Sequence, residues 1–374
     1  PLLILSLAAC GSADEQATQT EGVVDLGVKA QEIAHKYLVI DTHIDVPYRL
    51  YGNMEDVSVR TEGGDFDYVR AKEGGLDAPF MSIYIPAAEE AAGTATDTAN
   101  GLIDLVEGLE AGAPDKFMVA HNTADVEAAF AAGKIAFPMG MENGSPIAGS
   151  MENLKHFYDR GIRYITLAHS LANHISDSSY DTNKKWGGLS DFGKNLVSEM
   201  NKLGIMVDIS HVSDAAFWDV MEITKAPAIA SHSSARYFTP GFERNMDDNM
   251  IKALAENGGV IQINYGSSFL TEEANKFGDV RTASFEAYAE KNEVEKTLDN
   301  RIKWLAKNAS DFPYPYATLD QTLDHFDHVV KIAGINHVGI GSDYDGVGDT
   351  LPLGLKDVSS YPTLIEGLLN RGYS

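Results

Sequence analysis

The sequence predicts an α/β fold, a (β/α)8 barrel of the TIM type that forms one large domain. Three observations support this prediction. From residue 28 onward, short apolar runs alternate with longer amphipathic segments, which is the pattern of repeated βα units. Eight such runs are present, as many as a TIM barrel has strands. Polar residues that can bind metals follow the ends of several runs, and in a barrel these ends meet on one face.

The expected strands occupy residues 37–45, 79–85, 134–142, 162–169, 204–211, 227–232, 258–265 and 336–343. Amphipathic segments separate them. In residues 189–204, apolar side chains recur at steps of three to four residues and Gly204 supplies the stop, so we expect a helix there. The longest connection, 266–335, contains further helical patterns in 284–309 and 319–334. We therefore expect an inserted subregion and not a bare loop.

Composition and charge set limits on the protein class. The chain has 374 residues, 44% of them hydrophobic, which is enough for one large core without a second domain. It carries 29 basic and 55 acidic residues, a net charge of −26. Such a charge repels phosphate backbones and anionic lipid head groups, so nucleic acid is excluded as an expected partner.

The N-terminal segment has the pattern of a targeting sequence. Residues 1–10, PLLILSLAAC, are apolar and end in small residues before Cys10, the only cysteine, so no internal disulfide can form. The run is too short to span a membrane. Residues 7–10 resemble the bacterial lipoprotein processing site, in which the cysteine becomes the lipidated first residue. The alternative is a truncated secretory segment with an incidental cysteine.

Residues 11–27 are predicted to be a flexible tether, because the small polar stretch 11–24 has no helical or alternating period. Residues 28–374 then form the single catalytic barrel domain. This arrangement predicts a protein of the bacterial cell envelope, periplasmic or on the outer membrane, that contacts the membrane through N-terminal lipid only.

The chemistry begins at the end of the first expected strand. His43 and Asp45 lie two residues apart, so on a strand both side chains point to the same face and can bind one cation. The alternative is a helix-capping aspartate beside a core histidine. Glu142 ends another run, and its two carboxylate oxygens can bridge two metals. His211 and His232 end consecutive expected strands and supply neutral nitrogen ligands, although either alone could be a core histidine.

Asp343 ends the last expected strand in the segment GIGSDYDG, where glycines expose its carboxylate to a bound water. Its expected role is that of a proton shuttle. The glycines do not fit the dinucleotide pattern G-x-G-x-x-G. The chain also lacks G-x-S-x-G, H-E-x-x-H and a P-loop, which removes serine hydrolases, thermolysin-like peptidases and phosphate-cradling NTPases. The residues together predict a metal-dependent hydrolase.

Seven motifs, in order, resemble those of the membrane dipeptidase (renal dipeptidase) family of binuclear zinc peptidases, and the resemblance runs from about residue 30 to 370. The motifs are DTHIDVP (41–47), GMENG (140–144), LAHSLANHISDSS (167–179), GLSDFGKNLVSEMNKLGIMVDISHVSD (188–214), ASHSSAR (230–236), RNMDDNM (244–250) and GIGSDYDG (339–346). The resemblance implies a barrel of the metal-dependent hydrolase type. It implies one zinc held by His43, Asp45 and Glu142 and a second held by Glu142, His211 and His232.

The resemblance also implies that His169 contacts the scissile carbonyl region, that Arg244 pairs with the free carboxylate of the substrate, and that Asp343 is the catalytic acid/base. The planar fork of an arginine suits a carboxylate, while the alternative for Arg244 is a surface salt bridge. Tyr265 follows another strand and is a candidate for the pocket wall or for an ordinary place at the edge of the core. His174 is expected in a loop or behind the site.

The implied function is that of a zinc dipeptidase that hydrolyses the peptide bond of dipeptides by a metal-bridged hydroxide and accepts a D-residue at the C-terminal position. Two alternatives stay open. One is another amide or lactone hydrolase on the same barrel, and the other is a non-catalytic surface lipoprotein that binds peptides. A homodimer is compatible with the resemblance. Family members continue beyond the final residues, NRGYS, so a C-terminal truncation is expected.

Overall fold

The structure is a computed structural model, and it describes residues 25–374. Cys10 and most of the predicted tether therefore lie outside the described residues. Eight parallel strands form one sheet in the order β1-β2-β5-β6-β7-β8-β9-β10. Their bounds are β1 (Val39–Ile44), β2 (Leu76–Tyr84), β5 (Met139–Glu142), β6 (Ile162–Thr166), β7 (Met206–Asp208), β8 (Ile229–Ala230), β9 (Val260–Ile263) and β10 (Val338–Ile340).

The sheet curls until its first and last strands meet just beyond their carboxyl ends. Ile44 and Tyr344 form a parallel bridge. The Asp45 amide donates to the Tyr344 carbonyl at 2.9 Å, and the Asp343 amide donates to the His43 carbonyl at 3.1 Å. These contacts confirm the predicted TIM-like barrel. They also bring residues about 300 positions apart in the sequence into direct contact at the carboxyl face.

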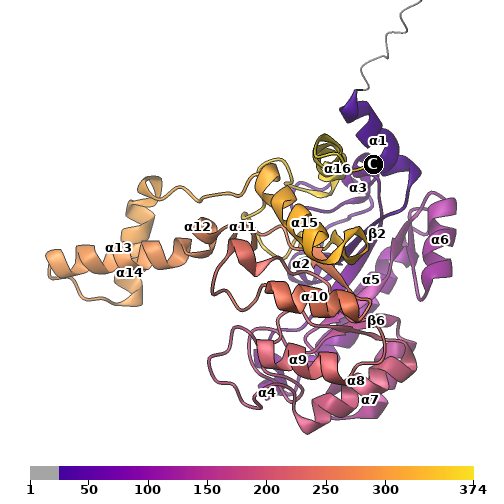
Figure 1. Cartoon of the computed structure of the whole chain (residues 1–374), viewed down its shortest axis with the longest axis horizontal. Coiled ribbons are helices and arrows are strands. Elements are labelled where there is room, and N and C mark those ends of the chain that lie inside the picture. The colour runs from indigo at the N-terminus through magenta and orange to yellow at the C-terminus, as the bar shows by residue number, and fades with distance from the viewer. Residues whose placement is uncertain (1–24) are drawn as a thin grey trace, which may run out of the picture.

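Helices surround the barrel (Figure 1). In chain order they are α1 (Leu26–Lys36), α2 (Val46–Gly52), α3 (Tyr68–Gly74), α4 (Ala88–Ala92), α5 (Ala95–Gly112), α6 (Thr123–Ala131), α7 (Met151–Asp159), α8 (Asp191–Leu203), α9 (Asp214–Ile223), α10 (Asp248–Glu256), α11 (Ser267–Leu270), α12 (Glu272–Asn275), α13 (Phe277–Lys291), α14 (Leu298–Lys307), α15 (Leu319–Ala333) and α16 (Tyr361–Asn370). Between residues 25 and 374, no helix is both long and apolar enough to cross a membrane.

Helix α8 shows how local sequence defines an element. Ser190 caps its first turn by accepting from the Gly193 amide, and Gly204 ends it with a left-handed φ of 83°. Leu196, Val197 and Met200 lie on its buried face. The helix predicted over 189–204 is therefore present, one to two residues shorter at each end.

The run 134–142, predicted as one strand, is divided at Pro138. Residues before it form β4 (Ile135–Phe137), which pairs with β3 (Phe117–Val119) in a separate two-stranded sheet, and residues after it form β5 in the barrel. Proline has no amide hydrogen to donate to a ladder. Its carbonyl still accepts from the Met81 amide at 2.8 Å. The single predicted strand was therefore wrong in this detail, and β3 was not predicted from the sequence.

The segment 266–335 contains helices, as its sequence pattern predicts. Helices α13 and α14 pair and project away from the barrel, whereas α15 lies against it (Figure 1). The indole of Trp304 in α14 lies 6.0 Å from the ring of Phe285 and 5.6 Å from that of Tyr288, measured between ring centroids. These contacts give the projecting helix pair a small apolar core of its own.

Candidate metal centre

Side chains that can bind metals converge at the carboxyl face of the barrel, where the parallel strands end. Each comes from the last residues of a strand or from the first residues after it. The residues brought together are His43, Asp45, Glu142, His169, His211, His232 and Asp343. All seven were predicted from the sequence, and the closure of the barrel places them in one cluster that is buried except for the partly exposed His169.

The carboxylate of Glu142 lies at the centre of this cluster, and both of its oxygens face imidazoles. Its Oε1 lies 3.1 Å from Nε2 of His211 and 3.4 Å from Nε2 of both His169 and His232. Its Oε2 lies 3.4 Å from Nε2 of His43. Glu142 thus belongs to two potential metal-binding groups, one with His43 and His232 and one with His169 and His211. This sharing is the arrangement that a binuclear site requires.

A third group joins His43, Asp45 and Asp343. The Nε2 of His43 lies 3.4 Å from Oδ2 of Asp45. Asp343 also accepts a hydrogen bond at Oδ2 from the side-chain amide of Asn264, at 2.8 Å. The Asp343 carboxylate therefore lies next to the candidate ligands, and one of its oxygens accepts a hydrogen bond from the uncharged side chain of Asn264.

The ring of His43 is oriented by Tyr164. Nδ1 of His43 lies 2.8 Å from the Tyr164 hydroxyl, and that hydroxyl donates to the Thr42 carbonyl at 3.0 Å. Since the hydroxyl hydrogen is used in this way, the hydroxyl oxygen accepts from Nδ1–H of His43. Nε2 of His43 then carries a lone pair that faces the cluster, as a metal ligand requires.

The ring of His232 is oriented by a second relay. Ser231 donates its hydroxyl hydrogen to Oδ2 of Asp208 at 2.7 Å, and its oxygen lies 2.7 Å from Nδ1 of His232. Asp208 is buried and also accepts from the Ser231 and Ser210 amides. Nδ1–H of His232 is thus a donor, and Nε2 is left free to bind a cation.

The electrostatics of the cluster suit a cation. Burial lowers the pKa of His211 and His232 well below the ordinary value for histidine, so both rings are neutral. Burial would raise the pKa of Glu142, but the positive charge that His43 and His169 carry when protonated outweighs this effect and holds that pKa well below its usual range. Burial raises the pKa of Asp343, and the nearby Asp45 carboxylate raises it further. The carboxylates of Asp45, Glu142 and Asp343 thus lie close together in a buried space, which favours a bound positive charge.

The buried polar atoms test whether these residues fit metal ions. Nε2 of His43 and Oδ1 of Asp45 have no hydrogen-bond partner within residues 25–374. Nε2 of His211 and Nε2 of His232 lie only 2.8 Å apart. Buried polar groups are normally satisfied, and bound cations would satisfy the atoms of His43 and Asp45 and would accept the facing nitrogens of His211 and His232 as ligands. The residues present therefore fit a metal centre that shares Glu142.

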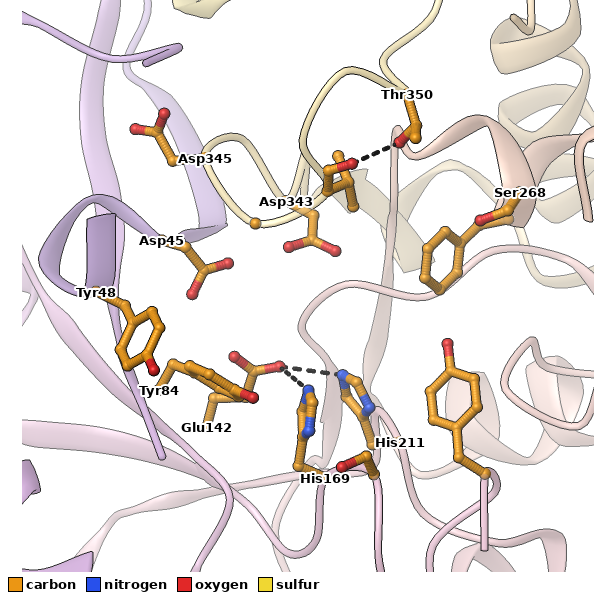
Figure 2. Close-up of a pocket in the computed structure, with 15 residues that line it drawn as sticks. Asp45, Tyr48, Tyr84, Glu142, His169, His211, Ser268, Asp343, Asp345 and Thr350 are labelled. Carbon is orange, nitrogen blue, oxygen red and sulfur yellow. Dashed lines mark hydrogen bonds and ion pairs between the residues drawn. The ribbon is translucent and has the colours of Figure 1, made fainter. Parts of the chain in front are cut away.

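A cavity of about 640 Å³ opens above the cluster (Figure 2). This volume lies within the ordinary range for small-ligand pockets. The aromatic side chains of its wall were not predicted from the sequence; they are Tyr48, Tyr84, Tyr180 and Phe269. The ends of the expected strands offered a signal for Tyr84 alone, because it is the last residue of β2 and so reaches the carboxyl face. Asp345 also lines the cavity.

Three residues singled out from the sequence but not as metal ligands lie outside the cavity wall. Arg244 is buried beside the cluster, where Nη1 donates to Ser233 Oγ and Nη2 to the His232 carbonyl, both at 2.7 Å. Tyr265 is fully buried and packs edge-on against Tyr344, with ring centroids 5.7 Å apart, so it occupies the core and not the pocket wall. His174 lies in a loop with its Nδ1 3.2 Å from Glu90 Oε2.

Comparisons with known proteins agree with this geometry. The model of the family described as "Membrane dipeptidase (Peptidase family M19)" matches residues 28–374 of this chain. An uncharacterized dipeptidase of Schizosaccharomyces pombe is 32% identical over 359 residues, which cover 91% of this chain and 76% of that protein. The structure of the probable dipeptidase PvdM from Pseudomonas aeruginosa aligns over 93% of both chains, with a TM-score of 0.80 and 25% identity.

A second solved structure adds a ligand. It is a metallopeptidase from Rhodobacter sphaeroides with a bound phosphinate mimic of the dipeptide L-Ala-D-Ala, and it aligns over 90% of this chain and 93% of its own, with a TM-score of 0.73 and 26% identity. The buried cluster around Glu142 and the match over nearly the whole described chain lead to one conclusion. The chain belongs to the membrane dipeptidase family, peptidase family M19, and is a metallo-dipeptidase.

Proposed function

We propose that the centre binds two zinc ions that share Glu142, the first with His43 and Asp45 and the second with His211 and His232. The observation that carries this proposal is the position of the Glu142 carboxylate, whose Oε2 faces His43 while its Oε1 faces His211 and His232. Nitrogen and carboxylate donors of this kind are ordinary zinc ligands. When bound, zinc supplies a Lewis acid for the substrate carbonyl and lowers the pKa of a water toward neutrality.

Asp343 is proposed as the acid/base residue. It lines the cavity, its carboxylate lies next to the ligand set, and Asn264 orients it through one oxygen. A carboxylate in this place can accept a proton from the attacking water and donate it to the nitrogen of the leaving amino acid. His169 lines the same cavity across Glu142, with its Nε2 3.4 Å from the Glu142 carboxylate, and we assign it to the region of the scissile carbonyl.

Arg244 is proposed to recognise the free carboxylate of the dipeptide. It uses Nη1 and Nη2 to hold the Ser233 hydroxyl and the His232 carbonyl, while Nε has no partner among the described residues. Its guanidinium lies 5.3 Å from the centre of the Phe269 ring, which lines the cavity. Further N–H donors of the guanidinium are thus available near the cavity wall, and a carboxylate would satisfy them.

The substrate class proposed is a free dipeptide, including those with a D-residue at the C-terminus. The metallopeptidase that binds the L-Ala-D-Ala mimic is similar over 90% of the chain, and this supports acceptance of an L,D pair. The cavity volume of about 640 Å³ is sufficient for a dipeptide.

Location and assembly are proposed from other features. Cys10, in the segment Leu-Ala-Ala-Cys, would anchor the protein to a bacterial envelope membrane through lipid. The projecting α13–α14 pair carries exposed apolar side chains, Val280, Leu298 and Ile302, that a second copy of the chain would cover in a homodimer. Sedimentation of the wild type and of Ile302→Asp tests this assembly, and an unchanged monomer in both would contradict it.

The central experiment is an activity screen of zinc-loaded protein over L,L and L,D dipeptides, with metal content measured on the same sample. We expect about two zinc ions per chain and release of both amino acids. Removal of zinc with a chelator should abolish hydrolysis, and adding zinc back should restore it. Zinc-loaded protein that cleaves no dipeptide, or cleaves with one zinc per chain, would contradict the proposal.

A further inference from the structure

The turn that follows β10 adopts a strained backbone next to the catalytic cluster. Asp343 and Asp345 both have a left-handed φ, of 64° and 66°, although neither is a glycine. Such conformations persist only where the surrounding structure holds them. The contacts that hold this turn therefore decide where the Asp343 carboxylate lies.

Gly346 in this turn lies against both catalytic carboxylates. A Cβ placed on Gly346 would be 2.2 Å from Oδ2 of Asp45 and 2.3 Å from Oδ1 of Asp343. The backbone of the turn thus passes directly beside Asp45 and Asp343. A small displacement of the turn would change the position of one carboxylate relative to the other.

Asp345 ties this turn to a distant segment. Its carboxylate points away from Asp45 and Asp343 in the close-up of the cavity (Figure 2), and its side chain is only 2% exposed. Oδ1 of Asp345 accepts from the Asp65 amide at 2.6 Å, and the Asp345 amide donates to Oδ2 of Asp65 at 2.8 Å. These reciprocal hydrogen bonds join residues 280 positions apart.

Arg49 connects the same pair to the helix that carries Asp45. Its Nε lies 3.4 Å from Oδ2 of Asp345, while Nη1 and Nη2 donate to the carbonyls of Gly63 and Phe66 at 2.9 and 3.0 Å. Arg49 lies on α2, and Asp45 is the residue immediately before that helix. One guanidinium therefore links α2, the segment that contains Asp65, and the turn that contains Asp343.

We propose that Arg49, Asp65 and Asp345 are positioning residues that hold the Asp343 carboxylate in register with Asp45. The proposal rests on the acid/base role of Asp343 proposed above. None of the three is assigned a contact with the substrate, because their polar atoms are directed at one another, at the Glu55 carboxylate and at backbone groups. Their effect on the reaction passes through the turn 343–346.

The test compares Asp65→Ala, which removes the acceptor for the Asp345 amide, with Asp65→Asn, which keeps an oxygen at that place. In Asp65→Ala we expect kcat to fall by roughly ten- to a hundred-fold, because an error of about 1 Å in a catalytic group can have this effect. KM and the zinc content should stay within about threefold of wild type. Asp65→Asn should retain most of the turnover.

A second pair of variants separates positioning from charge. Arg49→Gln alone leaves the Asp345 carboxylate buried without its cation, whereas Arg49→Gln with Asp345→Asn removes both charges. We expect kcat to stay low in the double variant, because the ion pair between Arg49 and Asp345, which links the turn to α2, is lost in the single and in the double variant. Amide hydrogen exchange in 61–67 and 343–350 should be faster than in wild type, which is a readout independent of activity.

Arg160→Gln is the matched control, since Arg160 pairs with Asp104 and Asn100 and touches no residue of the cluster. It should leave kcat unchanged. The positioning role would be overturned if Asp65→Ala kept full turnover or if Asp65→Ala and Asp65→Asn were equally impaired. Recovery of kcat in the double variant, or a loss of kcat that follows the zinc content, would also overturn it. Wild-type protein that hydrolyses no dipeptide would instead contradict the proposed function, and hydrogen exchange would still test the link.

Discussion

Replacing Asp343 by asparagine separates proton transfer from metal binding. The side chain lies in a buried place where its Oδ2 accepts from the Asn264 amide at 2.8 Å, and an asparagine oxygen can keep this bond. The new amide group would face the neighbouring Asp45 carboxylate and can donate to it. Because shape and hydrogen bonds are retained, we expect the fold and the zinc content of Asp343→Asn to match those of wild type.

The expected effect on turnover is large. A positioned acid/base contributes roughly 10²- to 10⁴-fold to a rate, which is about 3 to 5 kcal/mol of activation free energy. Other carboxylates in the cavity cannot take over this role, since Asp45 is a proposed zinc ligand, Glu142 faces the imidazoles and the Asp345 carboxylate points away (Figure 2). We therefore expect a loss of at least about a thousandfold in kcat, in the upper half of that range.

The assay measures kcat on a dipeptide together with zinc per chain in the same preparation. Asp45→Asn is the matched control, because the same isosteric change at a proposed ligand should lower zinc occupancy. Turnover of Asp343→Asn within a few-fold of wild type would remove Asp343 from proton transfer. Loss of zinc in parallel with turnover would instead make Asp343 a ligand, as its grouping with His43 and Asp45 would allow.

Four other predictions address the metals, the substrate, stability and the anchor. Glu142→Ala should lower the occupancy of both zinc sites, because one carboxylate serves both; one tightly held zinc that survives the change would refute the sharing. Arg244→Ala should lower kcat/KM by roughly thirty-fold or more for free dipeptides, and C-terminally amidated dipeptides should be poor substrates of wild type; equal cleavage of both forms would remove the carboxylate contact. Burial lowers the pKa of His325 to about 4. Between pH 6.5 and 4, His325 is therefore protonated in the unfolded chain and neutral in the folded chain. The free energy of unfolding should fall by about 3 kcal/mol as the pH is lowered from 6.5 to 4. Denaturant titrations of wild type and His325→Gln over this range test it, and equal slopes in the two proteins would count against it. Cys10→Ser should release the protein from membranes, while fractionation of wild type as soluble protein only would contradict the lipid anchor.

The sequence predicted the barrel and a candidate ligand set because both depend on local, periodic features. Strand side chains alternate between faces, so His43 and Asp45 could be assigned to one face from their spacing alone. Parallel strands in a barrel all end at one face, so residues at the ends of the expected strands were expected to meet without knowledge of any contact. The structure brings Glu142, His211 and His232 together as this argument requires.

The features that the sequence did not reveal depend on pairs of residues far apart in the chain. Nothing near Tyr164 indicates that its hydroxyl orients His43, since 121 residues separate them. Asp65 and Asp345 likewise find each other only when the barrel closes.

By itself, the sequence determined the class of fold, the order of the barrel strands and the candidate metal-binding side chains, because these follow from residue type and periodicity along the chain. Only the tertiary structure decided which tyrosines wall the cavity, that Tyr265 belongs to the core, and which way Asp345 points. Those properties arise from packing between segments that are distant in sequence, and no local pattern encodes the distance between two such segments.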